Sequence, residues 1–378
     1  LSKEIIFLIF FNIFLIINSL FSDHILHSLK SSVPYFRFIL YSLGVYLILC
    51  ETKTKNTIIF KLLLVYSLIF LCVDGIFQNY FGYNFFLMTD DSSSKISGLF
   101  GDEKILGSYL VRCLPFIIFI LLETKKKYLN IFICFFLFSI TIILSGERSS
   151  VLLLLPVIFF TTIYFSKFVN KKKLIIFFLS YILFITLLVF NNLEVKKRYI
   201  DLTLLQLNKV DKSLEKNIEE EDKHILKEKF FLNQYFVHYY SSYKMFLDKK
   251  LIGHGPNNFR KICSNEKYFF NVLNKKDMDN VEITELVPQG SCSTHPHNIY
   301  AQFLSELGLI GLCFLIFAQL FFLKELYYAY KNGSKYFFVI LTLIISLWPF
   351  ATSGNFFNNW LSILYFFPLG FYLFYKQN

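Results

Sequence analysis

The sequence predicts an all-α fold: a polytopic transmembrane helical bundle of about ten spans with one large, partly helical loop outside the membrane. Two observations support this prediction. Of the 378 residues, 55% are hydrophobic and only 17% are charged, whereas about a quarter of a soluble domain is charged. Many apolar runs also approach the roughly 20 residues that a helix needs to cross the hydrocarbon layer, and short Lys-rich breaks separate them.

The apolar runs place the spans in two groups. A region of about seven spans is expected over 1–191 and one of about three spans over 297–378, with the large loop at 192–296 between them. The first run has no small-residue cleavage site after it, so we expect a retained span rather than a secretory signal. The chain begins with Leu rather than Met, so one or two earlier spans could precede it. The expected spans are 5–22, 35–50, 57–75, 105–122, 129–145, 149–165, 174–191, 297–323, 336–350 and 360–375.

The basic residues predict how the bundle is oriented. One set of alternate short segments holds fourteen Lys and Arg and the other set holds four. The positive-inside rule therefore places both termini in the cytoplasm and the loop 192–296 outside. The net charge of +11 comes in short clusters between apolar runs, so we expect contact with membrane lipids and no nucleic-acid partner. The Lys-rich segments are the two termini, 51–56, 123–130, 166–173 and 324–335.

The large loop divides into three parts by composition. Its first part, Asp211–Phe230, is dense in Glu and Lys and is expected to form a solvated surface helix. The aromatic stretch Phe230–Leu247 follows and suits the membrane interface. Cys263 and Cys292 lie further along. On an oxidising side of the membrane they could form a disulfide, and the alternative is two free thiols.

Two histidines stand where the loop returns to the membrane, in Thr294-His295-Pro296-His297-Asn298. Pro296 can open a helix, which would place His297 and Asn298 in its first turn at the outer surface. A neutral imidazole there can accept a proton near pH 7. The alternative is an interfacial histidine without a catalytic role.

The residues around this point resemble a known signature. His297 and Asn298 are followed by nine residues, Gly308, two residues and Gly311. This spacing resembles the signature of the O-antigen ligase and O-antigen polymerase superfamily of bacterial membrane glycosyltransferases. Three earlier segments resemble further pieces of that family, and the resemblance covers roughly residues 95–325. These segments are Gly253-His254-Gly255 with the residues up to Arg260, the Arg148-bearing turn 144–150, and 101–110.

The resemblance implies a reaction and roles for particular residues. Such enzymes transfer a glycan from undecaprenyl diphosphate to an acceptor sugar hydroxyl, with inversion and without a metal. Their reaction is at the periplasmic face of the bacterial inner membrane. The acceptor is lipid A–core for a ligase and a growing glycan for a polymerase, and the sequence does not separate the two. His297 would be the general base, His295 the alternative base, and Asn298 would hold the imidazole or a sugar hydroxyl.

Arginines would bind the diphosphate, because the guanidinium fork matches phosphate oxygens and stays charged. The candidates are Arg148 and Arg260, followed by Arg112, which could equally form a structural pair inside a span, and Arg198, which could bind lipid head groups. A salt bridge with Glu147 is the alternative for Arg148. We interpret Glu306 as a buried polar contact between helices.

No cofactor or metal site is expected from the sequence. Asp277-Met278-Asp279 matches a short metal-binding pattern, but it lies in a charged outer loop and is interpreted as incidental. No His and Cys cluster has zinc spacing. A polysaccharide flippase or another transporter is the alternative from another class. It would predict inverted repeats with broken midplane helices, and no internal repeat is visible.

Overall fold

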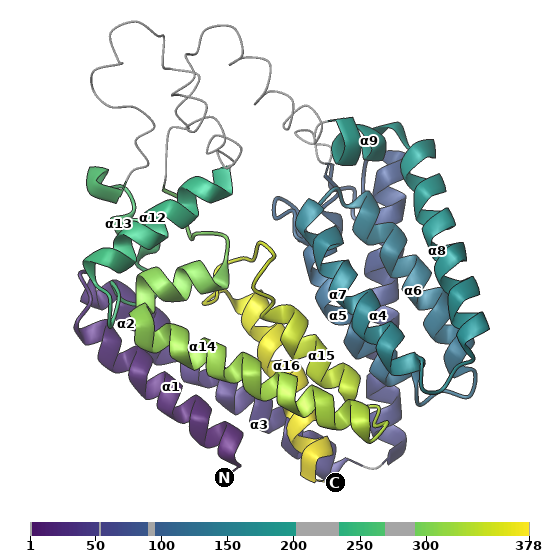
Figure 1. Ribbon diagram of the computed structural model, residues 1–378, viewed down its shortest axis with the longest axis horizontal. Helices are drawn as coiled ribbons and strands as arrows, with labels where there is room; N and C mark the ends of the chain where they lie inside the picture. The colour runs from purple at the N-terminus through teal and green to yellow at the C-terminus, as the bar shows by residue number, and fades with distance from the viewer. Residues whose placement is uncertain (1, 53, 90–94, 202–233, 269–291, 378) are drawn as a thin grey trace, which may run out of the picture. The chain divides into compact units, whose positions relative to one another are not determined.

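The computed structural model describes residues 2–52, 54–89, 95–201, 234–268 and 292–377 (Figure 1). The expected helix Asp211–Phe230 and the Asp277–Asp279 pattern lie outside these residues. Within them the fold is helical, apart from an isolated bridge between Tyr83 and Thr89. The chain forms two compact units. Unit 1 is Leu1–Leu43, Val210–Phe321 and Thr352–Phe366, and unit 2 is Gly44–Lys209, Phe322–Ala351 and Phe367–Asn378.

Unit 1 contains the amino-terminal helices and the return of the large loop. Aromatic side chains hold it together: the ring of Phe303 stacks on Phe11 at 5.9 Å between centroids and meets the edge of Phe356 at 4.8 Å. Because these three rings come from distant parts of the sequence, the cluster ties the first helix to the last third of the chain. The helices that lie wholly or partly in unit 1 are α1 (Lys3–Leu20), α2 (Ile25–Ser32), η1 (Val33–Tyr35), α3 (Phe36–Glu51), α12 (Gln234–Asp248), α13 (Phe259–Ile262), η5 (Glu266–Tyr268), α14 (Ile299–Lys331) and α16 (Asn359–Gln377).

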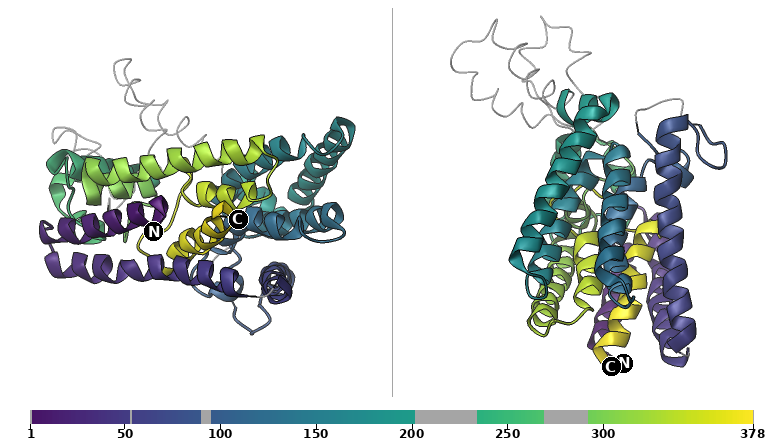
Figure 2. Two further views of the ribbon diagram at one scale, coloured as in Figure 1. Left: turned by 90° about the horizontal axis from the view of Figure 1, so that it is seen from below. Right: turned by 90° about the vertical axis from the view of Figure 1, so that its right-hand side faces the viewer.

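Unit 2 is a helical bundle built around α5 (Leu106–Leu121), which contacts α4, α6, α7 and α15. On the outside of the bundle, α8 packs against α6 (Figures 1 and 2). Three short helices, η2, α9 and η3, lie in the connections. The remaining bounds are α4 (Thr54–Phe81), η2 (Gly98–Phe100), α6 (Lys127–Leu144), α7 (Arg148–Phe165), α8 (Lys171–Asn191), α9 (Leu193–Lys196), η3 (Lys197–Asp201) and α15 (Phe337–Ser346).

Each expected span corresponds to a helix, but not every helix is long enough to cross a membrane. Among the described residues, seven helical segments have the length and composition of a span: α1, α2 with α3, α4, α6, α7, α8 and α14. The apolar helices α5 and α15 are shorter, with 16 and 10 residues. At 1.5 Å per residue they reach only about 24 and 15 Å. Trp348-Pro349 follows α15, and a proline cannot continue the helix.

The two short apolar helices are enclosed by protein. Every residue of α15 is buried, and so is every residue of α5 except Tyr109. In α8, by contrast, only 6% of the apolar window is buried. A helix that is apolar all round can be a membrane span or the centre of a large core. At the predicted spans 105–122 and 336–350 the structure therefore has shorter apolar helices that the rest of unit 2 encloses.

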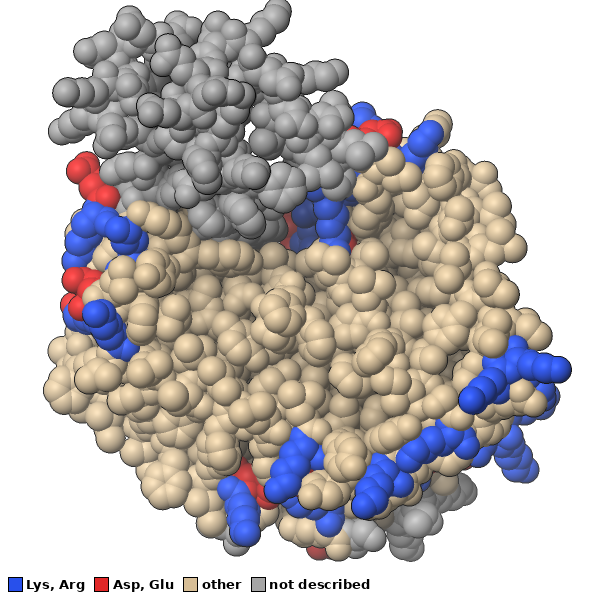
Figure 3. Space-filling model, viewed as in Figure 1, with Lys and Arg blue, Asp and Glu red and all other residues tan. Residues whose placement is uncertain are grey.

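Polar groups gather at the two ends of the unit 2 helices. At one end the Glu123 carboxylate binds Lys61 at 2.8 Å and Lys335 at 2.5 Å. At the other end the N–H of Gly107 donates to Glu147 at 2.7 Å. The surface of α7 and α8 between their ends is uncharged on the face seen in Figure 3. Within unit 2, the loops 123–130 and 324–335, which were expected on one side of the membrane, therefore meet at one end.

Candidate active site

The site is built where α14 begins, in unit 1. Asn298 caps this helix, because its side-chain oxygen accepts hydrogen bonds from the backbone N–H groups of Tyr300 at 2.9 Å and Ala301 at 3.1 Å. The helix thus starts at Ile299, and Asn is among the residues preferred at this position. His297 lies before the helix with a φ of +57°. The expectation that Pro296 opens the helix, with His297 and Asn298 in its first turn, is therefore wrong.

Helix α14 is broken at Gly308, where φ is +64° and ψ is −160°. Such a break leaves backbone groups without partners inside the helix. The loop 250–255 supplies those partners on both sides of the break. The N–H groups of His254 and Gly255 donate to the carbonyl oxygens of Ser305 (3.1 Å) and Glu306 (2.7 Å), and those of Leu309 and Ile310 donate to the carbonyl oxygens of Lys250 (2.8 Å) and Leu251 (3.2 Å).

The glycines of the sequence signature allow this close pairing. A Cβ atom on Gly308 would lie 2.5 Å from the backbone carbonyl of Leu251, and one on Gly253 would lie 2.5 Å from the carbonyl carbon of Glu306. Gly253 also has a φ of +65°, a conformation that glycine adopts without steric cost. The loop and the broken helix can approach this closely because neither glycine has a side chain.

Glu306 fixes the same loop from inside. Its buried carboxylate accepts hydrogen bonds from the backbone N–H groups of Asn257 and Phe259 and from the Gln302 side chain, each at 2.9 Å. We expected a buried polar contact between helices, and the structure shows that most of the partners are loop backbone. The signal in the sequence is a carboxylate in an apolar segment, because such a group is costly to bury without partners.

Three histidines gather beside the start of α14. The ring centroids of His295 and His297 are 4.2 Å apart, and that of His238, on α12, is 5.4 Å from His297. The Ser293 hydroxyl lies 3.2 Å from Nε2 of His297. The backbone of Ser353 donates to the carbonyl oxygen of His297 at 2.9 Å, and its own carbonyl oxygen lies 3.2 Å from Nε2 of His295. Sequence reasoning missed His238, which lies within the aromatic stretch that was assigned to the membrane interface.

This environment keeps the imidazoles neutral. Burial, with a smaller contribution from the charge of His238, lowers the pKa of His297 to about 4. Burial and then the charge of His297 lower the pKa of His295 to about 3, although the hydrogen bond with Ser353 opposes this. At neutral pH both rings therefore have a nitrogen that can accept a proton.

Arg260 is the predicted arginine that belongs to the same unit as His297. It lies on α13, its side chain is exposed, and its charge acts on His295 and Glu306. No carboxylate pairs with it among the residues that the structure describes. A disulfide joins Cys263, just after α13, to Cys292, with 4.9 Å between the Cα atoms. The disulfide ties α13 to the segment that leads into Ser293 and His297.

The other predicted arginines belong to unit 2, where Arg148 and Arg198 lie together. Arg148, at the start of α7, donates from Nη2 to the carbonyl oxygen of Arg198 at 2.9 Å, and Nε of Arg198 donates to the carbonyl oxygen of Gly146. Arg112 is buried in α5 and donates to the Ser108 carbonyl oxygen at 2.8 Å and to the Ser108 hydroxyl. Arg112 thus has a hydrogen-bond partner one turn away in its own helix.

Glu147 has different partners from those considered in the sequence. Its buried carboxylate accepts from the N–H groups of Gly107 at 2.7 Å and Ser108 at 3.3 Å and from the Ser150 hydroxyl at 3.0 Å. Burial raises its pKa despite these bonds. Burial first, and then the charge of Arg198, lowers the pKa of Lys95. Lys95 is therefore a further cation near Arg148 and Arg198, and sequence reasoning did not select it.

Residues 133–316 match a family described as O-antigen ligase. This match supports the O-antigen ligase and polymerase superfamily. The matched segment holds His297, Arg148, Arg198 and Arg260, together with the loop that pairs with α14. Arg112 lies before the segment. Among curated proteins, none matches the chain.

The family match supports a membrane glycosyltransferase of the ligase or polymerase type, in agreement with the helices long enough to cross a membrane. The signature residues have a local structural explanation. Asn298 caps the helix, Gly308 breaks it, and Gly253 allows a second loop to pair with the break. The result is that His297 lies next to a helix whose break is bridged by hydrogen bonds from a second loop.

Proposed function

We propose that the protein is a membrane glycosyltransferase that moves a glycan from undecaprenyl diphosphate to a sugar hydroxyl of lipid A–core. The observation that carries this proposal is His297: a neutral imidazole in a family member, held next to a rigid helix start. The Ser293 hydroxyl within 3.2 Å of Nε2 supports the proposal, because it shows that a hydroxyl can come within hydrogen-bonding distance of the base.

The proposed reaction is one displacement. His297 accepts the proton of the acceptor hydroxyl while that oxygen attacks the anomeric carbon of the donor. The bond from this carbon to the diphosphate oxygen breaks, and its electrons leave with the undecaprenyl diphosphate. Configuration at the carbon is inverted because the attack comes from the face opposite the leaving group. His295, with its ring 4.2 Å away, is the alternative base, and no step requires a metal.

Arginines would stabilise the leaving diphosphate. Arg260 is the first candidate, because it shares unit 1 with His297 and has an exposed guanidinium. In unit 2, Arg148 and Arg198 are separate candidates, and Lys95 joins them through its electrostatic contact. Arg112 is the weakest because it is buried and bonded to Ser108. The reaction is proposed for the periplasmic face of the bacterial inner membrane, with both termini in the cytoplasm.

The test uses a His297→Gly variant, because glycine tolerates the φ of +57° at this position. Purified protein in lipid nanodiscs is given undecaprenyl-diphosphate glycan and lipid A–core. We expect transfer to fall by about 10²–10⁴-fold, as is usual for loss of general-base catalysis. Added imidazole should restore part of the rate. A His297→Gly variant with the wild-type rate would contradict the base assignment.

The same assay addresses the leaving group and the acceptor. Arg260→Ala should slow transfer, and Arg260→Lys should restore only part of the rate because the fork of donors is lost. Arg37→Ala is the matched control, since Arg37 is an exposed arginine of unit 1 whose guanidinium binds Asn359. Chain growth on undecaprenyl diphosphate without lipid A–core would identify a polymerase instead of a ligase.

A further inference from the structure

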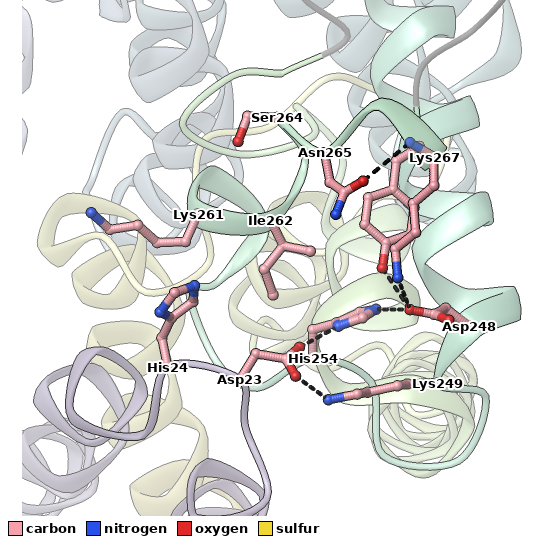
Figure 4. A pocket seen from close by; sticks show the side chains of 11 residues that line it. Asp23, His24, Asp248, Lys249, His254, Lys261, Ile262, Ser264, Asn265 and Lys267 are labelled. Carbon is pink, nitrogen blue, oxygen red and sulfur yellow. Dashed lines mark hydrogen bonds and ion pairs between the residues drawn. The ribbon is translucent and has the colours of Figure 1, made fainter.

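A cavity of about 590 Å³ lies within unit 1 (Figure 4). Its wall comes from three segments: the turn between α1 and α2, the carboxyl end of α12 with the loop that follows it, and the residues from α13 to η5. Cavities that bind small molecules have volumes of about 300–1,000 Å³. By the predicted topology, all three segments lie on the outer side of the membrane.

Two carboxylates in the wall are held in place but remain accessible. Asp23 binds Lys249 at 2.5 Å and Nδ1 of His254 at 2.6 Å. Asp248 accepts hydrogen bonds from Lys267 at 2.8 Å and from the Tyr268 hydroxyl at 2.6 Å. Each carboxylate side chain is 40% exposed. Their positions are thus fixed before any ligand arrives, which lowers the entropic cost of binding.

Both carboxylates are hydrogen-bond acceptors at neutral pH. Burial alone would raise the pKa of Asp23, but the hydrogen bonds from Lys249 and His254 outweigh it and the pKa is lowered. The hydrogen bonds from Lys267 and from the Tyr268 hydroxyl lower the pKa of Asp248. An ionised carboxylate can accept hydrogen bonds through two oxygens, which suits the neighbouring hydroxyl groups of a sugar. Each is already paired with a lysine, an arrangement that disfavours a metal ion.

The other residues of the wall offer further groups that can contact a ligand. Exposed Asn265 and Ser264 offer an amide and a hydroxyl, and half-buried Ile262 offers an apolar surface. Lys261 and His24 lie on the side away from Asp248, and Asp23 lies between His24 and Asp248 (Figure 4). Neither pairs with a carboxylate in the described part of the chain. The cavity therefore combines hydroxyl-binding groups with Lys261, a lysine that no carboxylate pairs with among the described residues.

Helix α13 and the Cys263–Cys292 disulfide connect the cavity to the histidine cluster. Lys261, in the wall, follows Arg260 directly on α13. Cys263, between two wall residues, is joined to Cys292, which precedes the Ser293 that contacts His297. A ligand seated in the cavity would thus lie against the element that presents Arg260.

We propose that this cavity binds the acceptor saccharide, through a sugar that carries an acidic substituent such as a phosphate. The carboxylates of Asp23 and Asp248 accept its hydroxyl groups, and Lys261 binds the acidic substituent. This inference rests on the proposed function, because it names the acceptor subsite of that reaction.

The test measures binding separately from transfer. The probe is the phosphorylated oligosaccharide released from lipid A–core by mild acid, beside the same oligosaccharide after phosphatase treatment. Wild-type protein should bind the phosphorylated form more tightly. Lys261→Ala should weaken that binding by about tenfold, or about 1.4 kcal/mol, and leave the affinity for the dephosphorylated form unchanged, because a charge-assisted hydrogen bond to the phosphate is lost. Lys30→Ala, at an exposed lysine outside the wall, is the matched control and should change nothing.

A space-filling variant tests the position of the site. Ser264→Trp fills the cavity without removing an ion pair and should abolish binding and raise the KM for the acceptor. Binding that survives in Ser264→Trp, or equal affinity for the two oligosaccharides, would overturn the proposal. His297→Gly should bind the probe normally, so a failure of the base assignment and a failure of the subsite give different results.

Discussion

His297 shows how neighbouring residues determine the state of a side chain. Its left-handed backbone lies outside the helix because Asn298 takes the capping position. Its ring lies between His295 and His238, and burial together with the charge of His238 keeps it neutral. An exposed histidine would be partly protonated near pH 6.5. The site therefore holds this base in its proton-accepting form across the physiological range.

The pH dependence of transfer tests this state. A base with a pKa of about 4 is deprotonated above that value and loses its function as pH falls through it. We therefore expect kcat/KM to show no decline from His297 between about pH 6 and 8 and to fall tenfold per unit below about pH 4. In His238→Ala the decline of kcat/KM should begin at higher pH, because the electrostatic effect of His238 that lowers the pKa of His297 is removed. A wild-type decline centred near pH 6.5 would contradict the prediction.

At the scale of elements, the main feature is the broken helix α14. The break at Gly308 is stable because the loop 250–255 satisfies the freed backbone groups and the Glu306 carboxylate holds the next part of that loop. Two segments that are distant in sequence thus form one support, with Arg260 and His297 at its ends. The spacing of the glycines reflects this contact.

Substitution of the glycines tests the contact. Gly308→Ala would place a Cβ atom 2.5 Å from the Leu251 carbonyl at a φ of +64°, so we expect a loss of about 1–3 kcal/mol in the free energy of unfolding. Gly44→Ala is the control, because no atom lies within 4 Å and its φ is ordinary. Thermal unfolding in detergent should show a lower Tm only for Gly308→Ala. Equal Tm values would mean that the two backbones can separate at little cost.

The disulfide can be tested in the same way. Replacing Cys263 and Cys292 by Ser should reduce stability by about 3 kcal/mol in the chain-entropy model. It should also slow transfer, because α13 and the His297 segment are no longer tied together. Cys50→Ser, at an exposed free cysteine, should have neither effect. A reductant should lower the Tm of the wild type but not that of the double variant, and any other pattern would argue against a structural role.

At the scale of the whole molecule, apolar helices occur in two environments. Helices such as α8 expose apolar side chains as a membrane span does, whereas α5 and α15 are enclosed within unit 2. The ends of the unit 2 helices carry the charges, with Glu123, Lys61 and Lys335 at one end and Glu147 at the other. This arrangement is what a lipid bilayer requires, since charges at the ends avoid the hydrocarbon layer.

Reporter fusions test the predicted orientation. Alkaline phosphatase joined after residue 126 or 170 should be inactive, because both loops are predicted to be cytoplasmic. The same enzyme joined after residue 100 or 200 should be active on the outer side. Green fluorescent protein at these four positions should show the opposite pattern. Activity after residues 126 and 170 would reverse the orientation and place the His297 site on the cytoplasmic side.

The sequence by itself determined the helical class and the resemblance to the family, and it singled out His297 as a candidate, because hydrophobic segment length and signature spacing are local properties of the chain. Only the tertiary structure decided that α5 and α15 are enclosed within unit 2 and that Glu306 holds a loop. His238 and the Asp23–His254 pair were also beyond the sequence. Each depends on contacts between residues far apart in the chain, and one sequence without its fold does not show which distant residues meet.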